Sequence, residues 1–598
     1  MIGTYAAAVA VCLAALALGQ AAVSLCGGRR WSWLAPPVGL ALLCALCWGT
    51  VRLPGHGVIS AILVAVLVVL AVAYLARRLE GGGDALREGW PVALAALVAA
   101  SLPFAAEGHF GILGTSFNPD MSQHLLAADR LAEGHGSELL RQGYPLGPHA
   151  VVVALDKGLG VGLVHGFSGL TLAVAVLAPL TALAAFRGLP WFARSAAALV
   201  VGLAYLVAAY YAQGAFKETI EALFVLAFAL AVRESTRGWA GLPLRFVPAA
   251  LLGVGAVYVY SFPGLLWLAG TAVVWLLVEL ALGRRPVEWR SAGLALLVFA
   301  IPVAPEIGRM VDFHSFETFD PHGPGLGNLF GQISPFEALG IWPSGDFRLA
   351  PGAGAVPAVG YYLGAAFGVV LLGYGLWWCW RRRETAVLAA LIACAVAYVA
   401  ARVGGTPYTA AKAIEIAAPL VALAIVLPLA SEIFGREGGE DAATPPSPQG
   451  GWGLGKAAAA IVFVLAAGVC SLLALANAPI GPSSYSPALT GFRADVGEGP
   501  TLVLASHQLL ADEQGTPYIS WELRGGRVCI AADGELEAPP HGVRYVVSEG
   551  SQREPPFPGL RVKRVAKPYV LWEATGPVAA ESPCPLIAVR QARQGPAR

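Results

Sequence analysis

The first long polar segment of the sequence carries a carboxylate that could act as a general base. Asp120 follows Asn118-Pro119, a dipeptide that favours an extended or turn conformation, and it stands at the start of an amphipathic stretch that predicts a helix. Gln123 and His124 follow three and four residues later, so they lie on the same helix face. A carboxylate held just outside the end of an apolar span could accept a proton from a hydroxyl group.

Other roles for Asp120 stay open on the sequence alone. An Asp before a helix can cap the first backbone N–H groups. Asp120 and His124 also have a spacing that suits two metal ligands, although no third ligand accompanies them. Two similar Asp and His pairs occur in the second long polar segment: Asp312 with His314, and Asp320 with His322. The sequence predicts no cofactor, with a divalent metal as the alternative.

The elements that position these residues follow from the composition. The chain has 598 residues, of which 57% are hydrophobic and only 13% charged, whereas soluble proteins carry about 25% charged residues. Apolar stretches of about 20 residues recur along it, which predicts a polytopic α-helical membrane protein and excludes a soluble enzyme, a disordered chain and a disulfide-framework toxin. The net charge of +1 gives no field that favours nucleic acid as a partner.

About fourteen spans are predicted, followed by a tail with ordinary charge density. The spans lie at 4–26, 32–51, 57–76, 90–106, 167–186, 195–212, 216–232, 246–260, 262–282, 291–304, 356–380, 385–401, 409–431 and 456–477. Residues 1–477 are therefore expected to form one transmembrane domain.

Alternate loops carry most of the Lys and Arg residues, and the charge bias of short loops predicts that these loops are cytoplasmic. The N-terminus, the loops 107–166 and 305–355, and the tail are then extracytoplasmic. Residues 149–164 contain Asp156 and Lys157. If they crossed the membrane fully, every later basic loop would face outward, against the charge bias, so we expect an interfacial or re-entrant helix there. The first segment lacks Lys and Arg before its apolar run, which favours a retained span over a cleaved signal peptide.

The tail, 478–598, predicts a small extracytoplasmic α/β domain. Its apolar runs predict strands at 501–505, 528–531, 543–547 and 569–573, with a helix near 509–523. Seven of the nine cysteines lie in or beside spans, where they suit packing. Cys529 and Cys584 are the pair in the tail, and they predict either a disulfide or two reduced thiols.

The layout resembles the GT-C superfamily of membrane glycosyltransferases, especially bacterial proteins related to protein mannosyltransferases and aminoarabinose transferases. The resemblance rests on the many spans, the large first outer loop with Asn118-Pro119-Asp120 followed by the segment 144–149 (Tyr-Pro-Leu-Gly-Pro-His), and the extracytoplasmic tail. Many family members have two adjacent acidic residues in this loop, whereas Asp120 has no acidic neighbour closer than Asp129 on one side and Glu107 on the other.

The resemblance implies an inverting transfer of a sugar from a polyprenyl-phosphate donor to a lipid, glycan or protein acceptor at the outer membrane face. Asp120 would be the catalytic base, and the leaving phosphate would need cationic or donor groups at the membrane surface. Candidate substrate-binding residues occupy helix ends on that side: His124, Lys217, Glu218, Arg402, Tyr408 and Lys412. Tyr408 and Lys412 share a helix face, and Lys412 could instead anchor the interface or pair with Glu415.

The second outer loop is rich in aromatic and polar residues, a composition typical of sugar sites and unlike that of disordered segments. No nucleotide-binding or zinc-protease motif is present. The sequence therefore predicts a multi-pass glycosyltransferase of the cell membrane whose partners are a polyprenyl-phosphate sugar, its acceptor and membrane lipids. A transporter or flippase of lipid-linked sugars or polysaccharide is the main alternative; a polysaccharide ligase or polymerase and a non-catalytic assembly protein are the others.

Overall fold

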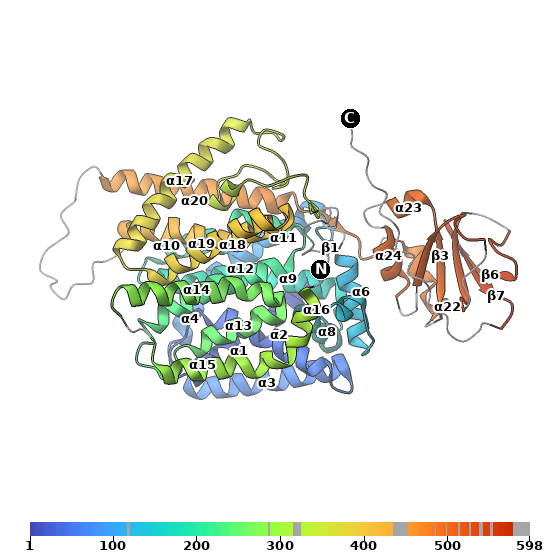
Figure 1. Cartoon of the computed structure of the whole chain (residues 1–598), viewed down its shortest axis with the longest axis horizontal. Coiled ribbons are helices and arrows are strands. Elements are labelled where there is room, and N and C mark those ends of the chain that lie inside the picture. The colour runs from blue at the N-terminus through green and yellow to red at the C-terminus, as the bar shows by residue number, and fades with distance from the viewer. Residues whose placement is uncertain are drawn as a thin grey trace, which may run out of the picture. The chain divides into compact units, whose positions relative to one another are not determined.

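The structure is a computed structural model, and it describes all residues except 116–119, 285–286, 315–324, 435–451, 485, 498, 512–514, 525–527, 538–541, 551–553 and 578–598. The chain forms two compact units (Figure 1). The first comprises residues 1–117 and 131–480, and the second comprises residues 118–130 and 481–598. The segment 118–130 thus belongs with the tail, whereas the sequence places it in the transmembrane domain.

Each predicted span coincides with a helix or with two consecutive helices of the first unit. The elements are α1 (Ile2–Leu25), α2 (Ala35–Val51), α3 (His56–Arg78), α4 (Gly82–Ala100), α9 (Leu163–Ala182) with η1 (Leu183–Phe186), α10 (Trp191–Gly202) with α11 (Tyr205–Ala212), α12 (Phe216–Ser235), α13 (Val247–Tyr260), α14 (Phe262–Ala281), α15 (Trp289–Val303), α17 (Ala358–Arg381), α18 (Thr385–Gly404), α19 (Pro407–Phe434) and α20 (Trp452–Ala476).

Shorter elements lie between these helices or, in the case of β2, after the last of them. They are α5 (Leu102–Glu107), β1 (Ile112–Leu113), α7 (Glu138–Arg141), α8 (Gly147–Leu159), η2 (Ala304–Glu306), α16 (Ile307–His314), η4 (Pro335–Leu339) and β2 (Ile480–Gly481). The 13-residue α8 lies where an interfacial or re-entrant helix is predicted. At 1.5 Å per residue it is about 20 Å long, which is shorter than the ~30 Å hydrocarbon core of a bilayer.

Nine of the described helical segments are long and apolar enough to cross a membrane, and a tenth is possible if α10 and α11, which meet at 54°, count as one span. The chain is therefore a multi-pass membrane protein, but the count of fourteen is not confirmed. The helices α2 and α13 are apolar but short. Three charged residues near the start of α12, Lys217, Glu218 and Glu221, lower the hydropathy of that helix.

The centre of the first unit consists of α9, α12 and α19, which are almost completely buried by the helices around them (Figure 1). The outer helices α3, α14, α15, α17 and α18 expose large apolar side chains, as expected for surfaces that face lipid. Small residues allow close helix packing, as is common in membranes. A Cβ atom on Gly19 of α1 would lie 1.8 Å from the carbonyl oxygen of Ala35 in α2, so only glycine fits there.

The second unit contains a five-stranded sheet with the strand order β4-β3-β5-β7-β6. The strands are β3 (Thr501–Ala505), β4 (Val528–Ala532), β5 (Tyr545–Glu549), β6 (Leu560–Ala566) and β7 (Tyr569–Ala574). β3 is parallel to β4 and β5, whereas β7 is antiparallel to β5 and β6. Helices α21 (Pro487–Gly491), α22 (Arg493–Val496), α23 (His507–Ala511) and α24 (Gly515–Glu522) accompany the sheet. The helix α6 (Met121–Ala132) begins in this unit.

Alternate residues of the strands pack into clusters on opposite faces of the sheet. Val503 and Leu571 belong to one apolar cluster, and Leu502 and Trp572 belong to the other. The four predicted strands overlap β3, β4, β5 and β7, whereas β6 was not predicted. The predicted single helix is α23 followed by α24. Cys529 is disulfide-bonded, and its predicted partner Cys584 lies outside the described residues.

Candidate functional site

A cluster of charged and aromatic side chains occupies helix ends inside the first unit. It involves the junction between α11 and α12 and the first turns of α19, which are the parts of the spans predicted to lie at the extracytoplasmic side. Lys412 Nζ of α19 lies 2.9 Å from Glu218 Oε1 of α12, and their side chains are only 15% and 7% exposed. The ion pair therefore joins two central helices in a largely water-free environment, where an unpaired charge would be costly.

Aromatic rings surround the two lysines of this cluster. Lys217 Nζ lies 3.8 Å from the ring centroid of Tyr144 and 5.7 Å from that of Tyr260. Lys412 Nζ lies 4.2 Å from the ring centroid of Tyr408, one turn earlier on the same helix. Ring faces attract cations, especially when water is excluded. The site thus holds two cations in fixed positions against aromatic rings.

Two further carboxyl groups lie one turn deeper in the same helices. Glu221 follows Glu218 on α12, and Glu415 follows Lys412 on α19. Both side chains are 0% exposed, and none of their four oxygen atoms has a hydrogen-bond partner. The hydroxyl group of the buried Tyr210, on α11, is also without a partner. Burial of so many polar oxygens in a membrane protein marks a functional site more often than a structural one.

A small pocket adjoins Tyr144. Its lining includes Gly143, Pro145, Tyr258, Ser261, Glu306 and Arg309. Glu306 accepts hydrogen bonds from the Trp48 indole (2.9 Å), Arg52 (3.0 Å) and Arg309 (3.0 Å). Arg309 also donates to the carbonyl oxygen of Tyr144. The pocket therefore has one carboxylate against two guanidinium groups.

Ser261 lines this pocket in a strained backbone conformation. Its φ of 62° and ψ of −152° lie in a region that is populated almost only by glycine. The residue connects α13 directly to α14, and it is buried. Strain of this kind persists where the surrounding packing fixes the chain, and it is concentrated at functional sites.

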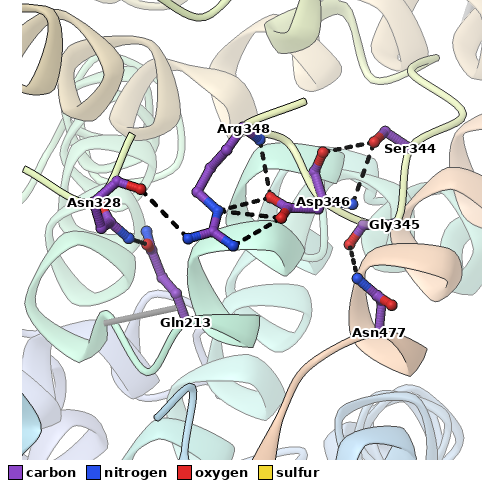
Figure 2. Close-up of polar contacts among 7 residues, drawn as sticks. All are labelled: Gln213, Asn328, Ser344, Gly345, Asp346, Arg348 and Asn477. Atoms are coloured by element: carbon purple, nitrogen blue, oxygen red, sulfur yellow. Dashed lines mark hydrogen bonds and ion pairs between the residues drawn. The ribbon is translucent and has the colours of Figure 1, made fainter. Parts of the chain in front are cut away.

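Part of the loop 305–355 contacts helix ends near the cluster. Asn328 donates to the side-chain carbonyl of Gln213, which ends α11, and Arg348 binds Asp346 through two nitrogens at 2.8 and 2.9 Å (Figure 2). Arg348 also reaches the carbonyl oxygen of Asn328 at 3.4 Å, and Asn477 at the end of α20 donates to the carbonyl oxygen of Gly345 at 3.1 Å (Figure 2). These contacts fix the loop segment against two helix ends.

The same loop contacts the N-terminal end of α19. The backbone N–H of Tyr408 donates to the carbonyl oxygen of Gly325 at 3.1 Å. In η4 of this loop, Ser334 and Glu337 form a reciprocal capping box. Burial raises the pKa of Glu337 well above its usual value, although its hydrogen bond from the backbone of Ser334 acts in the opposite direction. The predicted aromatic and polar loop is therefore ordered where the structure describes it.

The structure brings together four of the seven predicted site residues: Lys217, Glu218, Tyr408 and Lys412. The partner of Lys412 is Glu218, not the alternative Glu415. Arg402 lies in the last turn of α18 and is exposed, with no described contact to the cluster. The contributions of Tyr144, Tyr260 and Glu221 were not predicted. The sequence feature that could have indicated Glu221 is the cluster of charged residues at the start of α12, which also includes Lys217 and Glu218.

Asp120 and His124 belong to the second unit. Asp120 is exposed and precedes α6, and its carbonyl oxygen accepts the backbone N–H groups of Gln123 (3.0 Å) and His124 (3.2 Å). Asp129, which is also in the segment 118–130, lies 3.5 Å from Arg524. The position suits both a helix cap and an accessible carboxylate, so the catalytic role of Asp120 stays a prediction.

Within the described ranges, no group of three or more His, Cys, Asp or Glu side chains could hold a metal ion. The suggested ligands Asp312 and His314 lie in α16, whereas Asp320 and His322 lie outside the described residues. Asp120 and His124 gain no third ligand of these types in the part of the chain that is described.

Comparison with solved structures gives three similar folds. Two structures of arabinofuranosyltransferase AftD from Mycobacteria, one of them of a mutant, show 15% and 16% sequence identity, and each has a TM-score of 0.49. ArnT from Cupriavidus metallidurans, solved with undecaprenyl phosphate bound, shows 16% identity with a TM-score of 0.45. The likeness covers 81% of this chain in each case, 40% and 41% of the AftD chains and 98% of the ArnT chain.

AftD and ArnT are GT-C glycosyltransferases, the superfamily named by the sequence resemblance. This chain spans about two fifths of the length of AftD. No protein-family model and no curated protein matches the sequence. At these identities and TM-scores the likeness carries no argument about the reaction, which must be argued from the site.

Proposed function

We propose that this protein is a membrane glycosyltransferase that moves a sugar from a polyprenyl-phosphate donor to a lipid, glycan or protein acceptor at the outer face of the membrane. The observation that carries the proposal is the placement of Lys217 and Lys412 at buried helix ends, where both ammonium groups lie against aromatic rings. Lys412 also forms an ion pair with Glu218. Such fixed cations suit a phosphate group that gains charge as the sugar leaves.

In this proposal each residue has a defined role. Asp120 accepts the proton of the acceptor hydroxyl as its oxygen attacks the anomeric carbon, and the bond from that carbon to the phosphate oxygen breaks with inversion. Lys217 and Lys412 bind the phosphate, and Tyr408 positions Lys412. The donor lipid is of the same class as the undecaprenyl phosphate bound to ArnT. No step requires a metal.

The test supplies radiolabelled polyprenyl-phosphate sugars and native lipid extract to vesicles that contain the full-length protein. Asp120→Asn keeps the size of the side chain and removes the base, so we expect a loss of about 10²–10⁴-fold in transfer. Glu107→Gln is the matched control, because Glu107 is the exposed acidic residue nearest upstream in the same outer segment. Equal transfer by Asp120→Asn and wild type would make Asp120 a helix cap and remove it from the mechanism.

A transporter of lipid-linked sugars or polysaccharide is the second candidate, and the buried pair Glu221 and Glu415 favours it. Intramembrane carboxyl groups of this kind occur in the proton relays of transporters. Movement of a fluorescent lipid-linked sugar across sealed vesicles, without consumption of the donor, would support this candidate over the transferase.

A further inference from the structure

Glu221 and Glu415 have no role in the proposed transfer. They lie three residues deeper than Glu218 and Lys412 on α12 and α19, and both are completely buried. The absence of a donor to any of their four oxygens is unusual, because buried polar atoms in native proteins are nearly always hydrogen-bonded. Such atoms require a bound species that satisfies them.

The surroundings limit what that species can be. On the α14 side, a Cβ atom at Gly264 would lie 3.1 Å from Glu221 Oε2, so the helix backbone closes this side. Charges on Glu218, Glu221 and Lys412 all act on Glu415. Tyr210 of α11 and Tyr260 of α13 also interact with the charge of Glu415. Farther groups act on these neighbours: Lys217 of α12 acts on Glu218, Tyr408 of α19 acts on both tyrosines, and Glu337 of η4 acts on Tyr210.

The ammonium group of Lys412 is already paired with Glu218 at 2.9 Å. Neither deep carboxylate receives a hydrogen bond from it or from any other described group. An ionised carboxylate buried without donors is so unfavourable that the group takes up a proton instead. A protonated acid also removes the repulsion between Glu221 and Glu415.

The charge of the whole cluster depends on these protons. Lys217 and Lys412 contribute two positive charges, and an ionised Glu218 contributes one negative charge. Ionisation of both Glu221 and Glu415 would add two negative charges to this set. The protonated state therefore binds a phosphate group more tightly than the ionised state.

We propose that Glu221 and Glu415 form an intramembrane proton-binding site whose two protons raise the charge of the Lys217 and Lys412 cluster and thereby control its affinity for a phosphate group. The proton site stands on the burial and orphaned oxygens alone, and the control of phosphate affinity rests on the proposed function. Loss of these protons adds two negative charges to the cluster and weakens its binding of anions.

The proton site is tested first on the purified full-length protein without any ligand. Dicyclohexylcarbodiimide modifies protonated carboxyl groups in apolar surroundings, so we expect peptide mapping to find the adduct on Glu221 or Glu415 and not on Glu218. The infrared spectrum of wild type should show the carbonyl stretch of protonated carboxylic acids at neutral pH, weakened in Glu415→Gln and Glu221→Gln. The absence of both the adduct and the infrared band would overturn the proposal. Protection from labelling by sodium or potassium ions would also overturn it, because a bound metal cation would then occupy the site in place of protons.

Control of phosphate affinity is tested with undecaprenyl phosphate in vesicles over a series of pH values. Wild type should lose at least about tenfold in affinity at the alkaline pH where the infrared band disappears, which corresponds to about 1.4 kcal/mol. Glu415→Gln cannot ionise, so its affinity should change less over the same range. An equal decline in both would refute the control. If neither protein binds the lipid at any pH, the proposed function fails, and the infrared and labelling results still decide the proton site.

Discussion

Substitution of Lys412 by methionine tests whether the buried ion pair is as isolated from water as the structure indicates. Methionine keeps the length of the side chain and removes the cation, so Glu218 loses the partner that lies 2.9 Å away. Because Glu218 is only 7% exposed, water cannot replace that partner. The variant leaves a buried carboxylate whose remaining nearby cation is Lys217.

The expected cost can be worked out in two ways. Removing one partner of a buried ion pair costs about 3–5 kcal/mol. Protonation of the stranded carboxylate sets an upper limit, because a glutamate with an ordinary pKa of about 4.3 can be neutralised at pH 7 for about 4 kcal/mol. We therefore expect a destabilisation of about 3–4 kcal/mol at pH 7. The limit falls by about 1.4 kcal/mol for each unit of lower pH.

The assay is reversible unfolding in mixed micelles, followed by tryptophan fluorescence at pH 7 and pH 5. The double variant Glu218→Gln, Lys412→Met has no stranded charge and should recover most of the lost stability. Lys456→Met is the matched control, since Lys456 also pairs with a glutamate, Glu432, but both side chains are more exposed. That control should cost less than about 1 kcal/mol.

Two results would refute the reasoning. If Lys412→Met unfolds like wild type at pH 7, the pair is solvated or is not formed. If the variant is destabilised equally at both pH values, the cost arises from lost packing of the lysine side chain and not from the stranded charge of Glu218.

Three further predictions concern other parts of the first unit. Glu384 precedes α18 and binds Arg233 at 2.8 Å; burial alone would raise its pKa, but the hydrogen bonds and charges of the neighbouring arginines outweigh burial and lower it. A carboxylate whose pKa is lowered in the folded state stabilises the fold at pH values above its ordinary pKa, and this contribution is lost as the pH falls. The stability advantage of wild type over Glu384→Gln should therefore shrink below about pH 4.3, as measured in unfolding scans. Ser261→Gly should raise stability by about 1–3 kcal/mol, because glycine tolerates the positive φ, and no gain in the same scans would show that the strain is absent. Arg348→Lys cannot make the bidentate contact with Asp346, so hydrogen exchange of residues 325–348 should become faster while exchange in α9 stays unchanged; unchanged exchange in the loop would mean that other contacts hold it.

The helices were predictable because one physical quantity decides them. A span must satisfy its backbone polar groups internally and expose apolar side chains to lipid, so hydropathy and length locate it. The same logic located β3, β4, β5 and β7, whose buried residues form apolar runs. It failed for β6, where Arg561, Lys563 and Arg564 interrupt the pattern and nearly every residue is exposed. An edge strand of this kind gains its structure from pairing with β7 and carries little signal of its own.

The cluster was predictable only residue by residue. Lysine, glutamate and tyrosine at the predicted ends of spans indicated Lys217, Glu218, Tyr408 and Lys412 one at a time. Which groups pair depends on how α12 packs against α19, and the sequence does not contain that register. Local spacing offered Glu415 as a partner for Lys412, but the tertiary contact with Glu218 takes precedence. Glu415 is therefore buried without a hydrogen-bond donor, and this follows only from the packing of the helices.

The grouping of the segment that carries Asp120 also could not be predicted from the sequence. Its sequence position between predicted spans places it in the transmembrane domain, yet residues 118–130 group with the tail, from which ten predicted spans separate them. Within that second unit Asp129 lies 3.5 Å from Arg524, whose guanidinium carbon lies 3.5 Å from the ring centroid of Trp521. If Asp120 is the base, its position depends on residues of the tail that no local pattern connects to it. A loss of transfer in tail variants would then report on the placement of the base, and it would not by itself make the tail a substrate-binding domain.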